Sequence, residues 1–344
     1  MSEQVVDEKS LSKQTCSSSS SSRSTILCVG SINADVLIEI DRLPKVGETI
    51  ASSDPNSGYM LPGGKGFNQA TAVARLDSGL TCSRLATNFG NDSHAHALRA
   101  IAIKNGVDVE LCQNKNVPSG QAFILLEPGG ENSIIIVGGA NSDWDTDLSD
   151  HLKHAIRNAK CVLLQQEIPL RVNQAVARCA FEGSVPVMMD VGGEERKLPN
   201  ELLECVSLIS PNETELERMT NLPTDTEQQC ISAATELLNR GCASVLVTRG
   251  SHGAIHVTKN GSSVKTVSIG AFQMDKTKIV DTTGAGDCFR AAYAIACVEN
   301  QKSIEERLSF AAAACALCIQ VKGAQPSMPT RAQVEELLRG HDGS

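Results

Sequence analysis

The sequence has 344 residues, of which 41% are hydrophobic, so it is long enough to bury the core of one large domain. Its 40 acidic and 31 basic side chains give a formal net charge of −9, which leaves no basic field to attract nucleic acid or an anionic membrane. No apolar run approaches the roughly 18 residues that a membrane-spanning helix needs. The composition therefore favours small-molecule chemistry.

The first 24 residues are polar and serine-rich, without hydrophobic periodicity, and predict a disordered tail. Acidic residues in this segment argue against an organellar transit peptide, so we expect a cytoplasmic location, with the nucleus also accessible. The thirteen cysteines are odd in number and scattered through apolar runs, which is typical of reduced thiols rather than a disulfide framework.

From Thr25 onward, short apolar runs of strand length alternate with longer helical patterns. The strand-like runs are 25–31, 83–90, 161–166 and 185–190, and the helical patterns between them are 67–76, 93–106 and 171–183. Strands and helices that take turns in this way predict a largely parallel sheet covered by helices, which is the α/β class.

Two stretches interrupt this alternation with strands and turns but no helix, at about residues 36–61 and 107–138. They predict a small separate sheet, inserted in two pieces and placed as a substrate lid. Further on, the pair Asn260-Gly261 predicts a hairpin with a type I′ turn, and three helical patterns follow it.

The segment 30–35, "GSINAD", follows the first predicted strand. It places Asn33 and Asp35 at the carboxyl end of that strand, where ligands bind in open α/β sheets. The two side chains can project together toward the hydroxyl groups of a polyhydroxylated ligand. An ordinary Asx turn explains the same residues equally well.

The segment 63–70, "GGKGFNQA", is a glycine-rich loop that opens a helix. Its glycines permit close backbone approach, and Lys65 and Asn68 can contact ligand oxygens. The spacing is not that of a P-loop, so Lys65 is not interpreted as a Walker lysine. A purely structural turn into the helix remains the alternative.

The segment "PNETE" has two possible uses. Asn212 and Glu215 have the spacing of a helix capping box, and spacing alone favours that interpretation. The same two side chains can also orient water around Mg²⁺, which keeps several waters and takes few carboxylate contacts.

The segment "DTTGAGD", Asp281 to Asp287, leads into a helical pattern. Gly284, Ala285 and Gly286 would bring backbone N–H groups to an anion at the helix N-terminus, where the helix dipole favours negative charge. The simpler alternative is a helix start at which Asp287 only complements the dipole. The two flanking carboxylates would repel an anion unless they have other tasks.

Six motifs in this order resemble the ribokinase branch of the PfkB carbohydrate kinase family, over roughly residues 25–340. They are "GSINAD", "GGKGFNQA", "PNETE", "TRGSHG", "DTTGAGD" and "KGAQPS". The resemblance implies one kinase domain over 25–340, a three-layer α/β/α sandwich with a mostly parallel central sheet, and a small β-sheet lid that is also a dimer surface. It further implies transfer of the γ-phosphoryl group of ATP to O5 of D-ribose, with Mg²⁺, activation by K⁺ and a homodimer.

The resemblance also implies a role for each matching residue. Asp287 would be the catalytic base, with Gly284, Ala285 and Gly286 as the anion hole. The implied sugar contacts, besides Asp287, are Asn33, Ala34, Asp35, Gly64, Lys65, Gly66, Phe67, Asn68 and Glu167. The implied nucleotide contacts, besides Gly286 and Asp287, are Asn212, Thr248, Arg249, Gly250, Ser251, His252 and Gly253. Glu215 and Asn212 would organise Mg²⁺, and the implied K⁺ positions are Asp281, Thr283, Cys318, Val321, Gly323 and Ser327.

Four departures from the family pattern qualify these roles. Phe67 stands where a small residue is usual, and it either reshapes the sugar pocket or points into the core. The stretch "MMDVGGEERKLP" replaces an Asn-Pro-Ala-Pro loop, Arg290 replaces an asparagine, and Ala312 replaces a polar nucleotide contact. A kinase for another sugar or nucleoside therefore remains an alternative. A non-catalytic sensor is a further one, against which the complete set of catalytic motifs argues.

Overall fold

The structure is a computed structural model that describes residues 23–128, 131–194, 196–261, 263–299 and 303–342. Most of the predicted tail, residues 1–22, lies outside the described residues, and the first strand begins at Ser24, the last residue of that predicted segment. In the described part of the chain, no helix is both long and apolar enough to cross a membrane.

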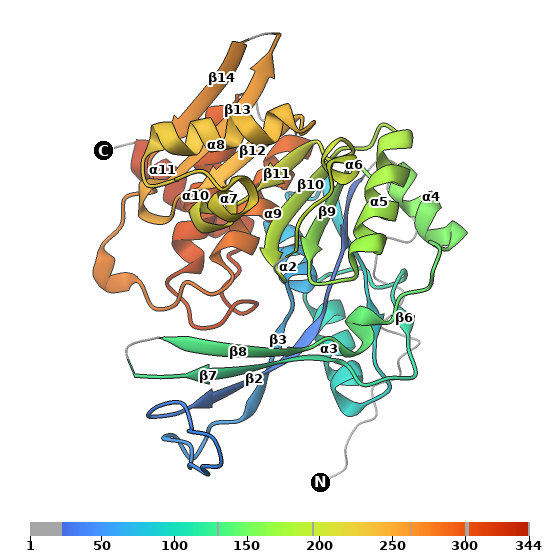
Figure 1. Ribbon diagram of the computed structural model, residues 1–344, viewed down its shortest axis with the longest axis vertical. Coiled ribbons are helices and arrows are strands. Elements are labelled where there is room, and N and C mark those ends of the chain that lie inside the picture. The colour runs from blue at the N-terminus through green and yellow to red at the C-terminus, as the bar shows by residue number, and fades with distance from the viewer. Residues whose placement is uncertain (1–22, 129–130, 195, 262, 300–302, 343–344) are drawn as a thin grey trace.

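An eight-stranded sheet forms the centre of the molecule, in the order β14-β13-β12-β11-β10-β9-β1-β4 (Figure 1). The strands from β12 to β4 run parallel, and β13 and β14 add an antiparallel edge. Their bounds are β1 Ser24–Val29, β4 Thr81–Ala86, β9 Cys161–Gln166, β10 Val187–Gly193, β11 Leu208–Ser210, β12 Ser244–Thr248, β13 Ala254–Asn260 and β14 Ser263–Ile269.

Helices cover both faces of this sheet, and each face has its own hydrophobic core. Successive residues of β1 show the division, because Ile26 belongs to one core and Leu27 to the other, as expected for a parallel strand buried on both sides. The first core lies under α2 (Lys65–Leu76), α3 (Ser93–Lys104), α9 (Ala285–Val298), α10 (Ile304–Cys318) and α11 (Arg331–Asp342). The second lies under α4 (Asp150–Asn158), α5 (Leu170–Glu182), α6 (Asn200–Leu203), α7 (Glu213–Thr220) and α8 (Glu227–Asn239). The predicted three-layer α/β/α architecture is confirmed.

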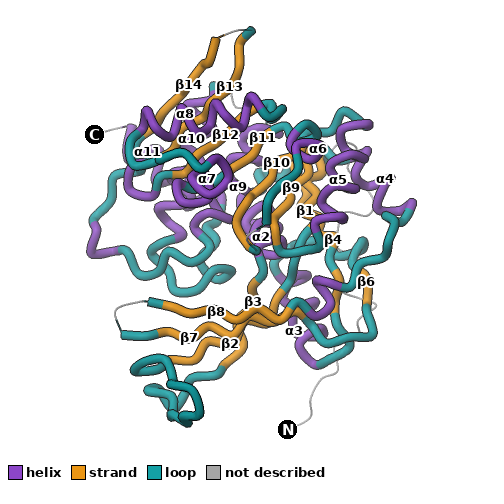
Figure 2. Tube along the Cα trace, in the orientation of Figure 1, coloured by secondary structure: helices purple, strands orange, loops and turns teal. Residues whose placement is uncertain are grey.

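A second sheet of four strands, here called the lid sheet, has the order β3-β2-β7-β8. Its strands are β2 Asn33–Glu39, β3 Tyr59–Gly63, β7 Gly120–Leu126 and β8 Asn132–Val137. Figure 2 shows it as a separate group of strands below the main sheet. Of the predicted stretch 107–138, the early part instead contains β6 (Gln113–Asn114), which pairs with β5 (Asn88–Phe89) outside the lid sheet.

The lid sheet is joined to the core where the site lies. Strand β2 starts four residues after β1 ends, and β3 leads directly into α2. The approach is close: a Cβ atom on Gly66 would lie 2.7 Å from the backbone carbon of Gly30. This places β2 and the first turn of α2 together at the carboxyl edge of the main sheet.

The predicted hairpin is present as β13 and β14, but its turn lies one residue later than expected. Asn260 still pairs with Ser263, and Gly261 has a φ of 63°. Asn260 therefore ends the strand, and the turn starts at Gly261 because glycine takes the left-handed conformation without a steric cost.

Candidate active site

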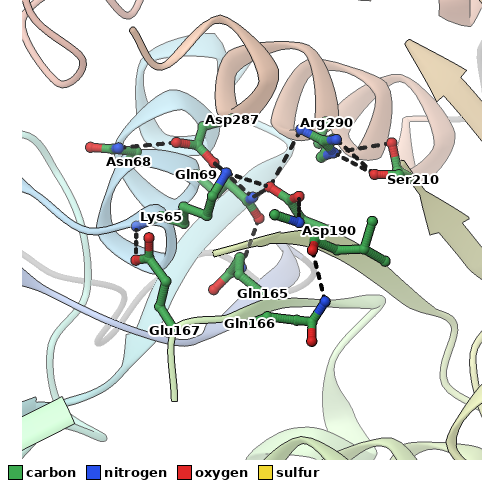
Figure 3. Close-up of polar contacts among 12 residues, drawn as sticks. Lys65, Asn68, Gln69, Gln165, Gln166, Glu167, Asp190, Ser210, Asp287 and Arg290 are labelled. Carbon is green, nitrogen blue, oxygen red and sulfur yellow. Dashed lines mark hydrogen bonds and ion pairs between the residues drawn. The ribbon is translucent and has the colours of Figure 1, made fainter. Parts of the chain in front are cut away.

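Asp287 lies in the first turn of α9 and is 4% exposed. Each of its carboxylate oxygens accepts one amide hydrogen bond at 3.0 Å, Oδ2 from Asn68 Nδ2 and Oδ1 from Gln69 Nε2 (Figure 3). The Nζ atom of Lys65 lies 3.9 Å from Oδ1. These donors, all from the start of α2, hold the carboxylate in one orientation.

The surroundings of Asp287 suit a proton acceptor. Burial raises the pKa of its carboxyl group above the ordinary range, Lys65 opposes the shift, and the neighbouring Asp190 adds to it. A carboxylate whose pKa lies above its usual value binds a proton more readily, which favours work as a general base near neutral pH.

The loop before α9 is shaped for an anion. Gly284 has a φ of 79°, and a Cβ atom there would lie 2.9 Å from Cα of Ala324, so any other residue is disfavoured on both counts. The N–H of Ala285 donates to the carbonyl of Thr282 at 3.2 Å. Within the described chain the N–H groups of Gly286 and Asp287 have no such partner, so these two remain for a ligand.

Among the residues predicted to contact the sugar are two buried oxygen atoms that can still accept a hydrogen bond. Oδ1 of Asp35 and Oδ1 of Asn68 are buried and have no hydrogen-bond partner among the described residues. Burial and the nearby Glu167 raise the pKa of Asp35 to about 7. Because buried polar atoms are rarely left unpaired, these oxygens mark positions where ligand hydroxyl groups would bind.

Glu167 closes the same side. Its Oε2 accepts hydrogen bonds from Ser31 Oγ at 2.5 Å and from the backbone N–H of Lys65 at 2.9 Å. Burial raises the pKa of the Glu167 carboxyl group, against the opposing effect of Lys65. Asn33 is tied to the core, because its Oδ1 accepts from Asn141 Nδ2 at 2.7 Å.

The remaining predicted sugar contacts form the frame of this side. Phe67 is fully buried in the hydrophobic core, so its ring points away from the ligand side, as one of the two alternatives expected. Ala34 is buried in β2, Gly64 caps the N-terminus of α2 with a φ of 88°, and Gly66 makes the close contact with Gly30 described above.

The predicted nucleotide turn, Thr248 to Gly253, follows β12. Thr248 pairs with Asn212, which brings this turn beside the start of α7. Arg249 is buried and its guanidinium lies 3.5 Å from Glu213 and 3.3 Å from Glu227, so its side chain is committed to α7 and α8. Gly250, Ser251 and His252 form a short 3-10 turn in which no residue is buried, and Gly253 has a φ of 88°.

Asn212 and Glu215 form the capping box that their spacing favours. Asn212 Oδ1 accepts from Glu215 N at 2.7 Å, and Glu215 Oε2 accepts from Asn212 N at 2.8 Å. Oε1 of Glu215 makes no hydrogen bond within the described part of the chain and is available to another partner. Among the described residues no cluster of three metal-ligating side chains exists. One spare carboxylate oxygen fits Mg²⁺ that is held mainly by water and phosphate oxygens.

The predicted K⁺ positions lie on two adjoining segments. Asp281 accepts hydrogen bonds from Thr283 N at 2.9 Å and from Gly323 N at 2.8 Å. Burial alone would raise the pKa of Asp281, but these bonds hold it below the usual value. Cys318 Sγ lies 3.0 Å from Ser327 Oγ. Val321 has an aliphatic side chain without a ligand atom, so only its carbonyl oxygen suits a cation. An anionic carboxylate among loop carbonyl groups fits a monovalent cation.

Three residues of the site were not predicted as site residues, namely Gln69, Asp190 and Arg290. Gln69 contacts both Asp190 and Asp287, and Arg290 contacts Asp190. Asp190 ends the predicted strand 185–190 and so carries the same signal that singled out Asp35, although the structure continues β10 to Gly193. Arg290 was noticed only as a departure from a family pattern.

Comparison with known proteins agrees with this geometry. The family described as pfkB family carbohydrate kinase matches residues 23–331. A ribokinase of Arabidopsis thaliana is 44% identical over 318 residues, which are 91% of this chain and 81% of the relative. A ribokinase of Haemophilus influenzae is 33% identical over 319 residues, 92% of this chain and 99% of the relative.

A solved structure of Arabidopsis thaliana ribokinase, complexed with ribose and ATP, is also similar. It has a TM-score of 0.84 at 43% identity and covers 93% of this chain and 99% of its own. The family match spans most of the chain and the relatives are matched over most of their length. The chain therefore belongs to the pfkB family of carbohydrate kinases.

Proposed function

We propose that this chain is an ATP-dependent kinase that phosphorylates D-ribose at O5. The observation that carries the proposal is the position of Asn68, whose Nδ2 donates to the candidate base Asp287 while its buried Oδ1 has no donor in the described structure. A sugar hydroxyl bound to that oxygen would lie beside Asp287. The solved relative complexed with ribose and ATP supports ribose as the substrate.

The proposed reaction needs one proton transfer and one phosphoryl transfer. Asp287 accepts the proton of O5 as that oxygen forms a bond to the γ-phosphorus, and the bond from this phosphorus to the bridging oxygen of ADP breaks. The N–H groups of Gly286 and Asp287 and the dipole of α9 stabilise the charge spread over the transferring group. Asp35, Asn68 and Lys65 hold the sugar so that O5 faces the phosphorus.

Two ions belong to this proposal. Oε1 of Glu215 would bind a water of Mg²⁺ on ATP, and that ion would supply positive charge to the phosphates. K⁺ near Asp281 would offset the negative charge of that carboxylate, so the first acid of "DTTGAGD" faces a cation and the last acid faces the sugar.

A substrate panel tests the function. ADP release is measured with ribose, other pentoses and hexoses, and nucleosides, each with and without K⁺. We expect ribose to give the highest kcat/KM. No turnover of ribose would refute the proposal, turnover of another sugar or a nucleoside would support the alternative kinase, and sugar binding without any turnover would support a sensor.

The K⁺ proposal has its own test. Replacing K⁺ with tetramethylammonium at constant ionic strength should lower kcat/KM, and Asp281→Asn should weaken the dependence on K⁺. Asp275→Asn is the matched control, because Asp275 also accepts a backbone N–H bond, from Thr277, in the loop before α9. An unchanged rate in the large cation would contradict K⁺ activation.

We further propose a homodimer through the lid sheet. On strand β8 the side chains of Ile134, Ile135, Ile136 and Val137 are 46% to 59% exposed, and an edge strand with such residues favours a partner. Ile135→Glu should convert a dimer to a monomer in light scattering. Val264→Glu on β14, an edge strand of the main sheet, is the control, and a wild-type monomer at micromolar concentration would contradict the proposal.

The cytoplasm is the proposed cellular location. It rests on the sequence expectation above, and imaging of a fluorescently tagged full-length chain tests it. A signal confined to an organelle would contradict it.

A further inference from the structure

A buried ion pair lies directly behind the candidate base. Arg290 is on α9, one turn after Asp287, and Asp190 is near the end of β10. Arg290 Nη1 lies 3.4 Å from Asp190 Oδ2, and the two side chains are 7% and 1% exposed. Both residues come from segments in which the sequence departs from the family pattern.

Asp190 shares two donors with Asp287. Its Oδ2 accepts from Lys65 Nζ at 3.3 Å and from Gln69 Nε2 at 3.1 Å, and these same two atoms reach Oδ1 of Asp287 (Figure 3). Its Oδ1 accepts from the backbone N–H of Gly192 at 2.8 Å. The position of Lys65 and Gln69 between the two carboxylates therefore depends on the charge of Asp190.

Each nitrogen of the Arg290 guanidinium contacts a described protein group. Its Nε donates to Ser210 O and Oγ at 3.1 and 3.0 Å, and Nη2 donates to Ser210 O at 2.7 Å. Nη2 also lies 3.8 Å from Oε2 of Glu215. The cavity beside Arg290 and Asp190 is about 10 Å³, which is room for about one water. The guanidinium also packs against the anion loop, since a Cβ atom on Gly286 would lie 2.5 Å from Arg290 Nη1.

We propose that Arg290 and Asp190 are positioning residues, which hold Lys65 and Gln69 between two carboxylates and thereby set the proton affinity of Asp287. Arg290 compensates the charge of Asp190, so that Lys65 and Gln69 remain available to Asp287. This inference rests on the proposed function, because its readout is the phosphorylation of ribose.

The charges around Asp287 determine the direction of each effect. The groups that face it are Lys65 on α2, Asp190 on β10, Glu167 after β9, Arg290 on its own helix, and the thiols of Cys28, Cys288 and Cys318. Burial raises the pKa of Asp287 and Asp190 adds to that shift. Without Arg290, Asp190 would draw Lys65 toward itself and raise this pKa further. Without the charge of Asp190, the pKa would fall.

The test is the pH dependence of kcat at saturating ribose and ATP. This quantity reports ionisation in the bound complex, so effects on ribose binding do not enter it. The acidic limb is the pH range in which kcat falls as the pH is lowered. In Arg290→Met this limb should shift to a pH about one unit higher, and kcat below it should be roughly tenfold lower than in the wild type. In Asp190→Asn the limb should shift to lower pH. Arg290→Lys should restore a limb close to that of the wild type.

A matched control separates positioning from stability. Arg331→Met also removes a partly buried arginine, whose Nη1 lies 2.7 Å from Oε2 of Glu299, the residue that follows α9. We expect this variant to unfold at a lower temperature while its acidic limb stays in place. Limbs of Arg290→Met and Asp190→Asn that stay in place or move in the same direction would overturn the inference.

The double variant keeps the test decisive if the unpaired Asp190 prevents Arg290→Met from folding. Asp190→Asn with Arg290→Met removes both charges, and its limb should coincide with that of Asp190→Asn alone, because Arg290 then has no charge to compensate. A further shift in this background would overturn the inference. A wild-type chain without ribose turnover would remove the proposed function and this inference together, whereas normal wild-type turnover with unmoved limbs would remove the inference only.

Discussion

Asp287→Asn is the substitution that probes the proposed chemistry most directly. It keeps the size of the side chain and removes the group that would accept the proton of O5. Loss of a general base typically slows a reaction by about 10² to 10⁴ fold, which corresponds to roughly 3 to 5 kcal/mol in the activation barrier. We expect a decrease in kcat within this range.

The effect on folding should be smaller, because two consequences oppose each other. The asparagine presents an NH₂ group to one of the two amide donors, Asn68 or Gln69, and an unsatisfied buried donor costs about 1 to 3 kcal/mol. In return, a buried carboxylate whose pKa is raised by burial is removed, which relieves a desolvation cost. The free energy of unfolding should therefore change by less than about 2 kcal/mol.

Two measurements separate catalysis from binding. ADP release at saturating ribose gives kcat, and calorimetric titration with Mg-ATP gives the nucleotide affinity, which we expect to stay the same or increase because a negative charge beside the anion site is lost. Glu299→Gln is the matched control, since Glu299 directly follows the last residue of the same helix and its side chain is 5% exposed, like that of Asp287. A variant that keeps wild-type kcat, or that no longer binds ATP, would refute the assignment of Asp287.

Three further outcomes are expected. The pKa of Asp35 is raised to about 7, so its ionised fraction falls from about nine-tenths at pH 8 to one-tenth at pH 6. If ribose hydroxyls need the carboxylate, the ribose Kd by calorimetry should rise about tenfold over that interval, and Asp35→Asn should show no such dependence. The stability that Asp35 contributes is complete below its unfolded pKa of 3.8 and is lost as pH rises through 7. Asp35→Asn should therefore gain unfolding free energy relative to the wild type, by up to about 4 kcal/mol at pH 8 in urea titrations, and an equal difference at pH 4 and pH 8 would contradict the burial argument. Gly284→Ala should lower both kcat and the unfolding temperature, since its Cβ would lie 2.9 Å from Cα of Ala324 at a φ of 79°, whereas Gly270→Ala, with open space around its Cβ and an ordinary φ, should change neither.

The sequence contained enough local information to predict the fold and the main motifs. Alternating apolar runs predicted the parallel sheet, because a strand buried on both faces and an amphipathic helix leave different periodicities. The capping box of Asn212 and Glu215 was also predictable, since it joins residues three positions apart. The glycines of "DTTGAGD" indicated an anion site because they affect the backbone of their immediate neighbours, which is again a local effect.

Only the tertiary structure decided which distant side chains meet. The ring of Phe67 lies in the core, and the spare oxygens of Asp35 and Asn68 have no partner among the residues described, although no local pattern distinguishes these residues from others in their loops. The contact of Asp190 with Arg290 joins residues 100 positions apart on different elements. Such contacts depend on how strands and helices pack, and packing decides both the dielectric environment and the partners of a charge, which together set its pKa and its chemistry.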